Sequence, residues 1–137
     1  MDAAPAIVAR LVADPEVSAL IGSRVRPIAV GDEPLPYVTY RIISDRPTHT
    51  LSGASGLHQA RAQVESWAGG YAQSKALAAA VRAALQGHYS AAGVAVHQSR
   101  LDDESDLAVV VEEGEGVGPF AARQDYLMAY GPDESGE

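Results

Sequence analysis

One stretch of the chain constrains the fold more than any other part of the sequence. From Leu57 to Trp67 the residues alternate between two kinds of side chain. One set is small or apolar: Ala60, Ala62, Val64 and Ser66. The other set is polar: Gln59, Arg61, Gln63 and Glu65. Successive side chains of a β-strand point to opposite faces, so this pattern predicts a strand with one face on a core and one in solvent.

The following residues predict the layer that covers the apolar face. Gly69-Gly70 ends the strand, and Tyr71–Gln86 is an alanine-rich segment typical of a helix, which Gly87 ends. Its apolar stripe comprises Leu77, Val81, Ala84 and Leu85. Two short helices are predicted near the N-terminus, from Pro5 to Ala13 and from Pro15 to Ile21. Asp14 is suited to cap the second helix and Gly22 to end it.

Other segments predict further strands in hairpin-like succession. They are Val25–Val30, Tyr37–Ser44, Val94–Leu101, a short run at Leu107–Val111, and Phe120–Tyr130. Pro27 predicts an edge position for the first of these, because proline cannot donate to a strand ladder. The order of elements indicates an α+β fold. We expect an antiparallel or mixed sheet, with one long helix and the short N-terminal helices packed on one face.

Three segments are predicted to lie outside regular structure. Residues Asp45–Gly56 carry one proline and two glycines among small polar residues, which indicates a long, mobile hairpin connection. Residues 102–115 are expected to form a solvated acidic loop around the short run at Leu107–Val111. Residues 131–137 are expected to be a disordered acidic tail, which leaves residues 1–130 as a single domain.

The charge of the chain is strongly local. The net charge is −8, with 10 basic and 18 acidic residues. Segment 102–115 contributes −7 and the tail 131–137 contributes −3, so the rest of the chain is close to neutral. A general surface for gripping phosphates is disfavoured, because affinity for nucleic acid comes mostly from lysine and arginine. No apolar run approaches the length of a membrane span, and the first residues do not resemble a signal peptide.

The sequence offers no convincing catalytic or metal-ligating constellation. There is no cysteine, so disulfides, thiolate metal sites and a cysteine nucleophile are excluded. The four histidines lack the spacing of a helical metal motif. Asp102, Glu104, Asp106 and Glu113 have the spacing of a calcium loop, but Leu107 stands where that loop needs glycine. We therefore expect no catalytic residue, metal or cofactor, and predict that the chain is not an enzyme.

Four stretches of the chain resemble a known family in order and spacing. Residues 35–40 (LPYVTY) resemble its P-Y-V-x-Y opening strand, and residues 50–56 (TLSGASG) its glycine-bearing loop. Residues 57–85 resemble its central unit of a strand ending in tryptophan, a short break and an alanine-rich helix. Residues 102–107 resemble its x-D-E-x-D segment. Over residues 5–107 the chain is similar to the tail completion, or tail terminator, proteins of phages with long non-contractile tails. It then departs from the family pattern by inserting the acidic, glycine-rich stretch Val109–Gly118.

This resemblance implies an assembly protein of the virion. Similar proteins form a ring, usually of six subunits, on the head-proximal end of the tail tube. The ring stops tube polymerisation and joins the tail to the neck proteins of the head, while the genome passes through its lumen without specific binding. The implied partners are copies of the same chain, the tail tube protein and a head-completion protein. The implied location is the virion, after assembly in the host cytoplasm.

Three groups of residues are candidates for these contacts. A ring joins two different patches of each subunit, and the candidates for these patches are Arg41, Arg61 and Glu65. Contact with the tube or neck is predicted for the 45–56 connection, with Arg46, His49 and Leu51. A lumen that lets DNA slide would carry negative charge, and the candidates are Asp102, Asp103, Glu104, Asp106, Glu112 and Glu113.

Two alternatives stay open at this point. The chain could be another connector of the same particle, such as a head-closure protein or a tail tube subunit, which share its size. A small-molecule-binding or hydrolytic α+β domain would need a pocket with converging polar groups. The sequence shows no such set, so this second alternative is the weaker one.

Overall fold

The computed structural model describes residues 2–28, 34–50, 53–110 and 117–133. Within these ranges the chain forms three helices and six strands. The helices are α1 (Ala4–Ala13), α2 (Pro15–Ile21) and α3 (Tyr71–Leu85). The strands are β1 (Val25–Pro27), β2 (Tyr37–Thr50), β3 (Gly53–Ala68), β4 (Gly87–Ala91), β5 (Val94–Val110) and β6 (Val117–Pro132).

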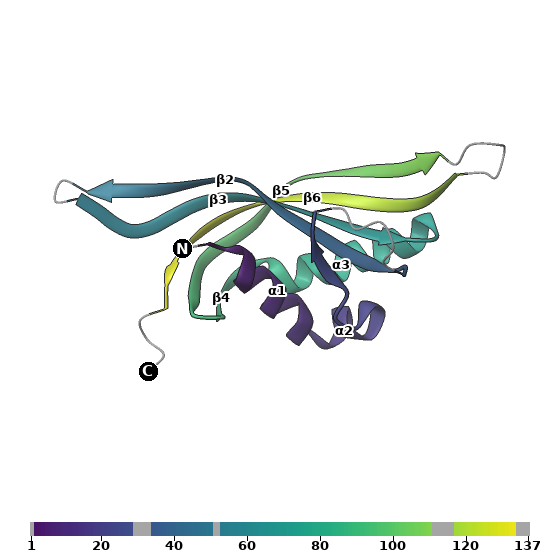
Figure 1. Cartoon of the computed structure of the whole chain (residues 1–137), viewed down its shortest axis with the longest axis horizontal. Coiled ribbons are helices and arrows are strands. Elements are labelled where there is room, and N and C mark those ends of the chain that lie inside the picture. The colour runs from purple at the N-terminus through teal and green to yellow at the C-terminus, as the bar shows by residue number, and fades with distance from the viewer. Residues whose placement is uncertain (1, 29–33, 51–52, 111–116, 134–137) are drawn as a thin grey trace.

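The six strands form one sheet in the order β1-β2-β3-β6-β5-β4. The short edge strand β1 runs parallel to β2, and all other neighbours are antiparallel. All three helices lie on the same side of the sheet (Figure 1). The prediction of an α+β fold with a mixed sheet and helices on one face is therefore confirmed.

The core lies between the two central strands and the helices. Small residues of β3 stand beside large residues of β6: Ala60 pairs with Met128, and Ala62 with Tyr126. All four are at most 4% exposed. Because the alanines occupy little volume, the tyrosine and methionine side chains can fill the space under the sheet. The helices close this core with Ile7, Leu11, Leu77, Val81 and Leu85, so the predicted stripe of α3 is buried.

The N-terminal helices form as the sequence predicts. The Asp14 carboxylate accepts a hydrogen bond from the Val17 amide at 3.0 Å, and Gly22 follows α2 with a φ of 62°. Ile7 and Leu11 are buried, whereas Val12 is 39% exposed and does not belong to the buried face. The cap and the glycine set the bounds of α2, while burial of one face holds both helices against the sheet.

The predicted mobile connection at Asp45–Gly56 is wrong. Strand β2 continues to Thr50 and β3 begins at Gly53, so the two strands form one long hairpin. Pro47 suggested a loop, but β1 pairs with β2 only from Val38 to Tyr40. Beyond Tyr40 the outer edge of β2 has no described strand beside it, and a proline there breaks no ladder on that side. Irregular pairing between Ile42 and Ser44, and between Pro47 and His49, bends this hairpin further.

The predicted acidic loop is also wrong for the part that the structure describes. Strand β5 runs without a break through the acidic residues to Val110 and pairs with β6 along its length. The calcium-like spacing therefore falls on a strand, with Glu113 outside the described residues. Long-range pairing with β6 outweighs the low strand propensity of the carboxylates, which the sequence alone cannot reveal.

Two element ends also differ from the prediction. Strand β6 continues through Pro132, and the Asp133 amide donates to the Gly93 carbonyl at 3.0 Å. Residues 131–133 are thus ordered, and the rest of the predicted tail lies outside the described residues. The sequence did not predict β4. Gly87, expected only to end the helix, is the first residue of this strand and has a φ of 103°.

Gly131 lies where two backbones meet at the end of the sheet. A Cβ atom added there would lie 2.8 Å from the carbonyl oxygen of Gly56. Real Cβ atoms do not approach backbone this closely, so the strands would have to separate.

We expect Gly131→Ala to lower the free energy of unfolding by about 1–3 kcal/mol because of this overlap. Urea denaturation followed by circular dichroism measures the change. Gly69→Ala is the matched control, since nothing lies within 4 Å of its added Cβ, and it should shift stability by less than about 0.5 kcal/mol. Equal effects of the two substitutions would contradict the close approach.

Candidate functional site

The face of the sheet opposite the helices carries a polar surface that no described element covers (Figure 1). It is built by the second set of alternating side chains on each strand. The strand pairing aligns Thr39 with Glu65 and Arg41 with Gln63 across β2 and β3. It aligns Glu65 with Arg123 and Gln63 with Asp125 across β3 and β6. We call this surface the open face.

Arg61 is the centre of one charge cluster on the open face. Its guanidinium donates to Asp125 at 2.9 Å and to Asp102 at 2.6 Å, and so joins β3, β6 and β5. Hydrogen bonds to Asp102 and then Asp125 raise the pKa of Arg61 above its usual value. Gln63 also donates to Asp125, at 3.2 Å. These bonds tie together strands that enter the sheet from distant parts of the sequence.

Glu65 is the centre of a second cluster. Its carboxylate accepts from Arg123 on β6 at 2.9 Å and from the Thr39 hydroxyl on β2 at 3.3 Å. The Trp67 indole donates to the same hydroxyl at 3.3 Å, and its ring stacks on Tyr37. Trp67, the tryptophan that ends the strand of the central motif, thus holds the end of β3 against the start of β2.

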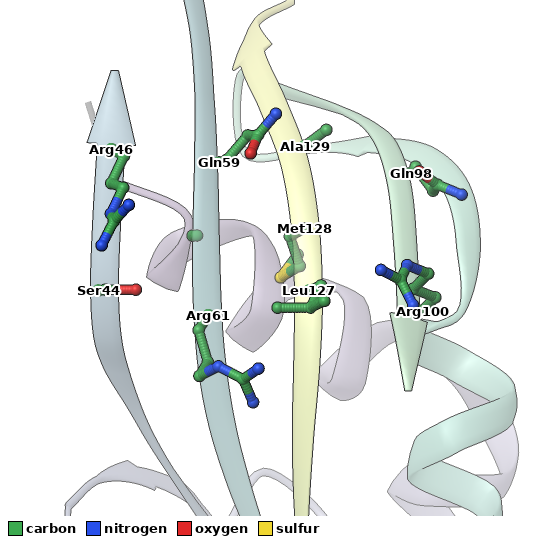
Figure 2. Close-up of a pocket in the computed structure, with 10 residues that line it drawn as sticks. Ser44, Arg46, Gln59, Arg61, Gln98, Arg100, Leu127, Met128 and Ala129 are labelled. Atoms are coloured by element: carbon green, nitrogen blue, oxygen red, sulfur yellow. The ribbon is translucent and has the colours of Figure 1, made fainter. Parts of the chain in front are cut away.

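Between the strands the open face holds a shallow furrow of about 320 Å³ (Figure 2). Arginines from three strands surround it, Arg46 from β2, Arg61 from β3 and Arg100 from β5. Leu127 and Ala129 of β6 lie between them. The furrow is wide and open, and the arginines give it positive character. It suits contact with another macromolecule better than enclosure of a small molecule.

Two hairpins extend from the middle of the sheet in opposite directions, and the β2–β3 hairpin reaches past the helices (Figure 1). We call residues 41–61 the β2–β3 arm and residues 100–125 the β5–β6 arm. By sequence the β2–β3 arm has a net charge of +2 and the β5–β6 arm a net charge of −6. The two ends of the molecule are therefore unlike in charge.

One lysine joins the β5–β6 arm to the helix layer. Lys75 of α3 donates to Glu104 at 2.8 Å and to Asp106 at 3.1 Å. Tyr71 donates to Asp106 at 2.9 Å, and the buried Gln124 donates to Glu104 at 2.7 Å. The hydrogen bond from Lys75 is the main cause that lowers the pKa of both carboxyls, and the pKa of Lys75 is raised in turn. We call this set the Lys75 cluster.

The structure brings the predicted interface residues to one surface. Arg41, Arg61 and Glu65 all lie on the open face. Arg61 and Glu65 are engaged within the chain, whereas Arg41 is exposed and has no hydrogen bond or ion pair among the described residues. Their role in an interface stays a prediction.

The other predicted site residues lie on the two arms. Arg46 lines the furrow, His49 is exposed near the end of β2, and Leu51 lies outside the described residues. Of the acidic candidates, Asp102 bonds Arg61, while Glu104 and Asp106 belong to the Lys75 cluster. Asp103 is exposed, and Glu112 and Glu113 lie outside the described residues. Much of the described acidity is therefore balanced by cations of the same chain.

Sequence reasoning missed the residues that complete these clusters. Asp125 stands beside Arg61 only once β3 and β6 are paired, and Arg100 reaches the furrow only once β5 is paired with β6. Alternation with apolar neighbours placed Asp125 on a polar face, but nothing in the sequence showed which strands are adjacent. Lys75 gave no signal beyond being the only lysine in the chain.

The described residues contain no group of three or more histidines, aspartates and glutamates arranged to hold a metal ion. No helix among them is long and apolar enough to cross a membrane. The features that the structure does build are a polar sheet face and two charged arms.

The sequence of the chain matches a family of tail completion proteins. The sequence model of the family described as "Tail completion protein gp17" matches residues 5–111, from α1 through the end of β5. The chain belongs to this family. As a tail completion protein it is a structural component of the virion, which the resemblance of the sequence motifs predicted.

The fold of this tail completion protein is also found in a solved particle. It is similar to a chain in the structure of the virion of a native gene transfer agent particle, with a TM-score of 0.66 and 24% sequence identity. The similarity covers 91% of each chain. Comparison with curated proteins gave no match.

The Lys75 cluster should make stability depend on pH. Glu104 and Asp106 have lower pKa values in the folded protein than their ordinary values of 4.5 and 3.8. Their ionised forms therefore stabilise the fold above these ordinary values, and this stabilisation is lost as the pH falls. We expect Lys75→Met to lower the melting temperature by a few degrees at pH 7, and the difference from the unmodified protein to vanish at strongly acidic pH.

Thermal unfolding between pH 2 and pH 8 measures this difference. Arg46→Met is the control, because that exposed arginine has no acidic partner among the described residues. A difference for Lys75→Met that stays constant over this range would show that the lysine stabilises by packing alone.

Proposed function

We propose that this tail completion protein is a tail terminator. Six copies form a ring on the head-proximal end of the tail tube, end its polymerisation and join the tail to the head. The observation that carries the proposal is the family match over residues 5–111, on a chain whose open face and arms offer surface for contact with other chains.

The shape of the subunit supports a ring. A closed ring is built from heterologous contacts, so each subunit needs two different patches that fit each other. The two arms point away from each other and carry opposite net charge. Opposite charge on the two patches favours this contact over contact between two identical patches.

The remaining predicted residues then divide among the other partners. Arg46, His49 and Leu51 on the β2–β3 arm contact the tube protein or the head-completion protein. Of the acidic candidates, Asp103 is exposed and has no cation beside it among the described residues, and it lines the lumen together with Glu112 and Glu113. Negative charge there keeps the genome from binding as it passes. Assembly takes place in the host cytoplasm, and the protein acts without catalysis.

The test is to remove the gene and image the particles that form, by negative-stain electron microscopy. We expect overlong tails without heads beside filled heads without tails, because nothing then stops the tube or offers the docking face. A plasmid copy of the gene should restore normal particles.

Other outcomes would assign the protein elsewhere. Tails of normal length that fail to join heads would make it a neck or head-closure protein. Absence of any tube would make it a tube subunit. Normal infectious particles would overturn a structural role.

A further inference from the structure

We infer that neighbouring subunits of the ring join by strand pairing, the outer edge of β2 in one subunit against the outer edge of β5 in the next. This inference rests on the proposed ring and names the contact that builds it. The partner is a second copy of this chain, and the result is one sheet that continues from subunit to subunit.

Both edges are free over a long stretch of the described structure. β1 covers β2 only from Val38 to Tyr40, which leaves residues 41–47 without a described strand beside them. β4 covers β5 only from Val94 to Ser99, and the Leu101 amide meets the side chain of Gln86. From Asp102 to Val110 no described strand lies along the outer edge of β5.

Free edges of this length need an explanation. Each exceeds a typical strand of about 5–6 residues, and an unpaired edge offers backbone donors and acceptors to any other chain. The β2 segment projects past the helices (Figure 1), whereas α3 lies under the β5 segment and meets one face of it through the Lys75 cluster. Residues 43–47 and 102–106 are all exposed. In a ring of identical copies, one neighbour satisfies the β2 edge of each subunit and the other neighbour satisfies its β5 edge.

Charge selects which edges meet. Asp102, Asp103, Glu104 and Asp106 lie on the β5 edge, whereas the β2 edge carries Arg41, Asp45 and Arg46. Two β5 edges would bring like charges together, and charges directly opposite in a sheet destabilise pairing when they are alike. Pairing of β2 with β5 instead places Arg41 and Arg46 near carboxylates.

The topology also sets the direction of pairing. Within the subunit β2 and β5 run antiparallel, because each neighbouring pair from β2 through β3 and β6 to β5 is antiparallel. Because the two arms point in opposite directions, the next subunit must be displaced along the strands. One step of the proposed six-fold ring turns it by less than a right angle, so its β5 stays closer to antiparallel than to parallel with β2. The contact is heterologous and closes a ring when the rotation closes.

Pairs of introduced cysteines test the contact in assembled particles. The chain has no cysteine, so there is no background. Ser44→Cys on β2 is combined with a cysteine at Asp103, Ser105 or Leu107, and the particles are treated with a short bis-maleimide. The three positions scan the register, because alternate residues of a strand share a face. We expect at least one pair of cysteines to give a ladder of covalent oligomers, the largest of which has the number of subunits of the complete ring.

Three controls make the result decisive. Ser44→Cys alone should give no oligomer, and a dimer from it would mean that β2 pairs with β2, which overturns the inference. Ser44→Cys with Ala83→Cys, exposed on α3, should also give none. A ladder from that pair would mean that the cross-linker joins any subunits that lie close together, whether or not their strands are paired. A mixture of particles that carry the single variants should give none, because the contact lies within one ring.

The outcomes separate this inference from the proposed function. If normal-length tails contain the protein but no Ser44 pair cross-links, the ring stands and strand pairing is wrong. If the particles lack the protein, or deletion leaves tails of normal length, the proposed function itself fails.

A charge swap provides a second test that needs no introduced thiol. Arg46 and Asp103 are exposed and have no ion partner among the described residues, so exchanging them breaks no salt bridge inside the described chain. Arg46→Glu and Asp103→Arg should each lower the yield of normal-length tails severalfold, and the double variant should recover most of it. Strictly additive losses would contradict pairing of these edges.

Discussion

The structure depends on a sheet that is covered on only one face. Ala60, Ala62 and Val64 of β3 face the helices, where Tyr126, Met128 and Tyr130 of β6 fill the space that the small residues leave. The register of these two strands is therefore held by the hydrophobic effect, since a slip of one residue would bury Arg61 and Glu65 instead. The strands β2 and β5 pair with the two sides of this central pair, and α3 covers its apolar face.

The uncovered parts of the sheet are stabilised by polar contacts. Arg61 and Arg123 tie the strands together across the open face, and the Lys75 cluster ties the β5–β6 arm to α3. These bonds are partly exposed and individually weak, so the arms depend more on the long strand ladders than on any ion pair. Such arms suit an assembly protein, because they can complete their packing against another subunit.

A structural role also explains why no compact catalytic site is found in the described chain. The furrow on the open face is broad, and its arginines come from three strands, with Arg61 engaged by the carboxylates of Asp102 and Asp125. Membership of the tail completion family accounts for these surfaces as contacts. In the proposed ring the functional units are strand edges and arms rather than a cleft.

The sequence by itself determined the one-sided sheet, the two N-terminal helices with the Asp14 cap of the second, the buried stripe of α3 and the family. These features depend on the local spacing of apolar residues, on caps such as Asp14 and on breaks such as Gly69-Gly70. All of these are patterns among residues that are close in the sequence. Only the tertiary structure decided the lengths of the hairpins. Pro47 and the carboxylates of β5 argue locally for loops, yet both lie in strands, because a free outer edge tolerates the proline and Lys75, distant in sequence, balances the acids. The order of strands in the sheet also decided that Arg46, Arg61 and Arg100 surround one furrow. A single sequence does not show which distant segments pair, so this arrangement could not be predicted from it.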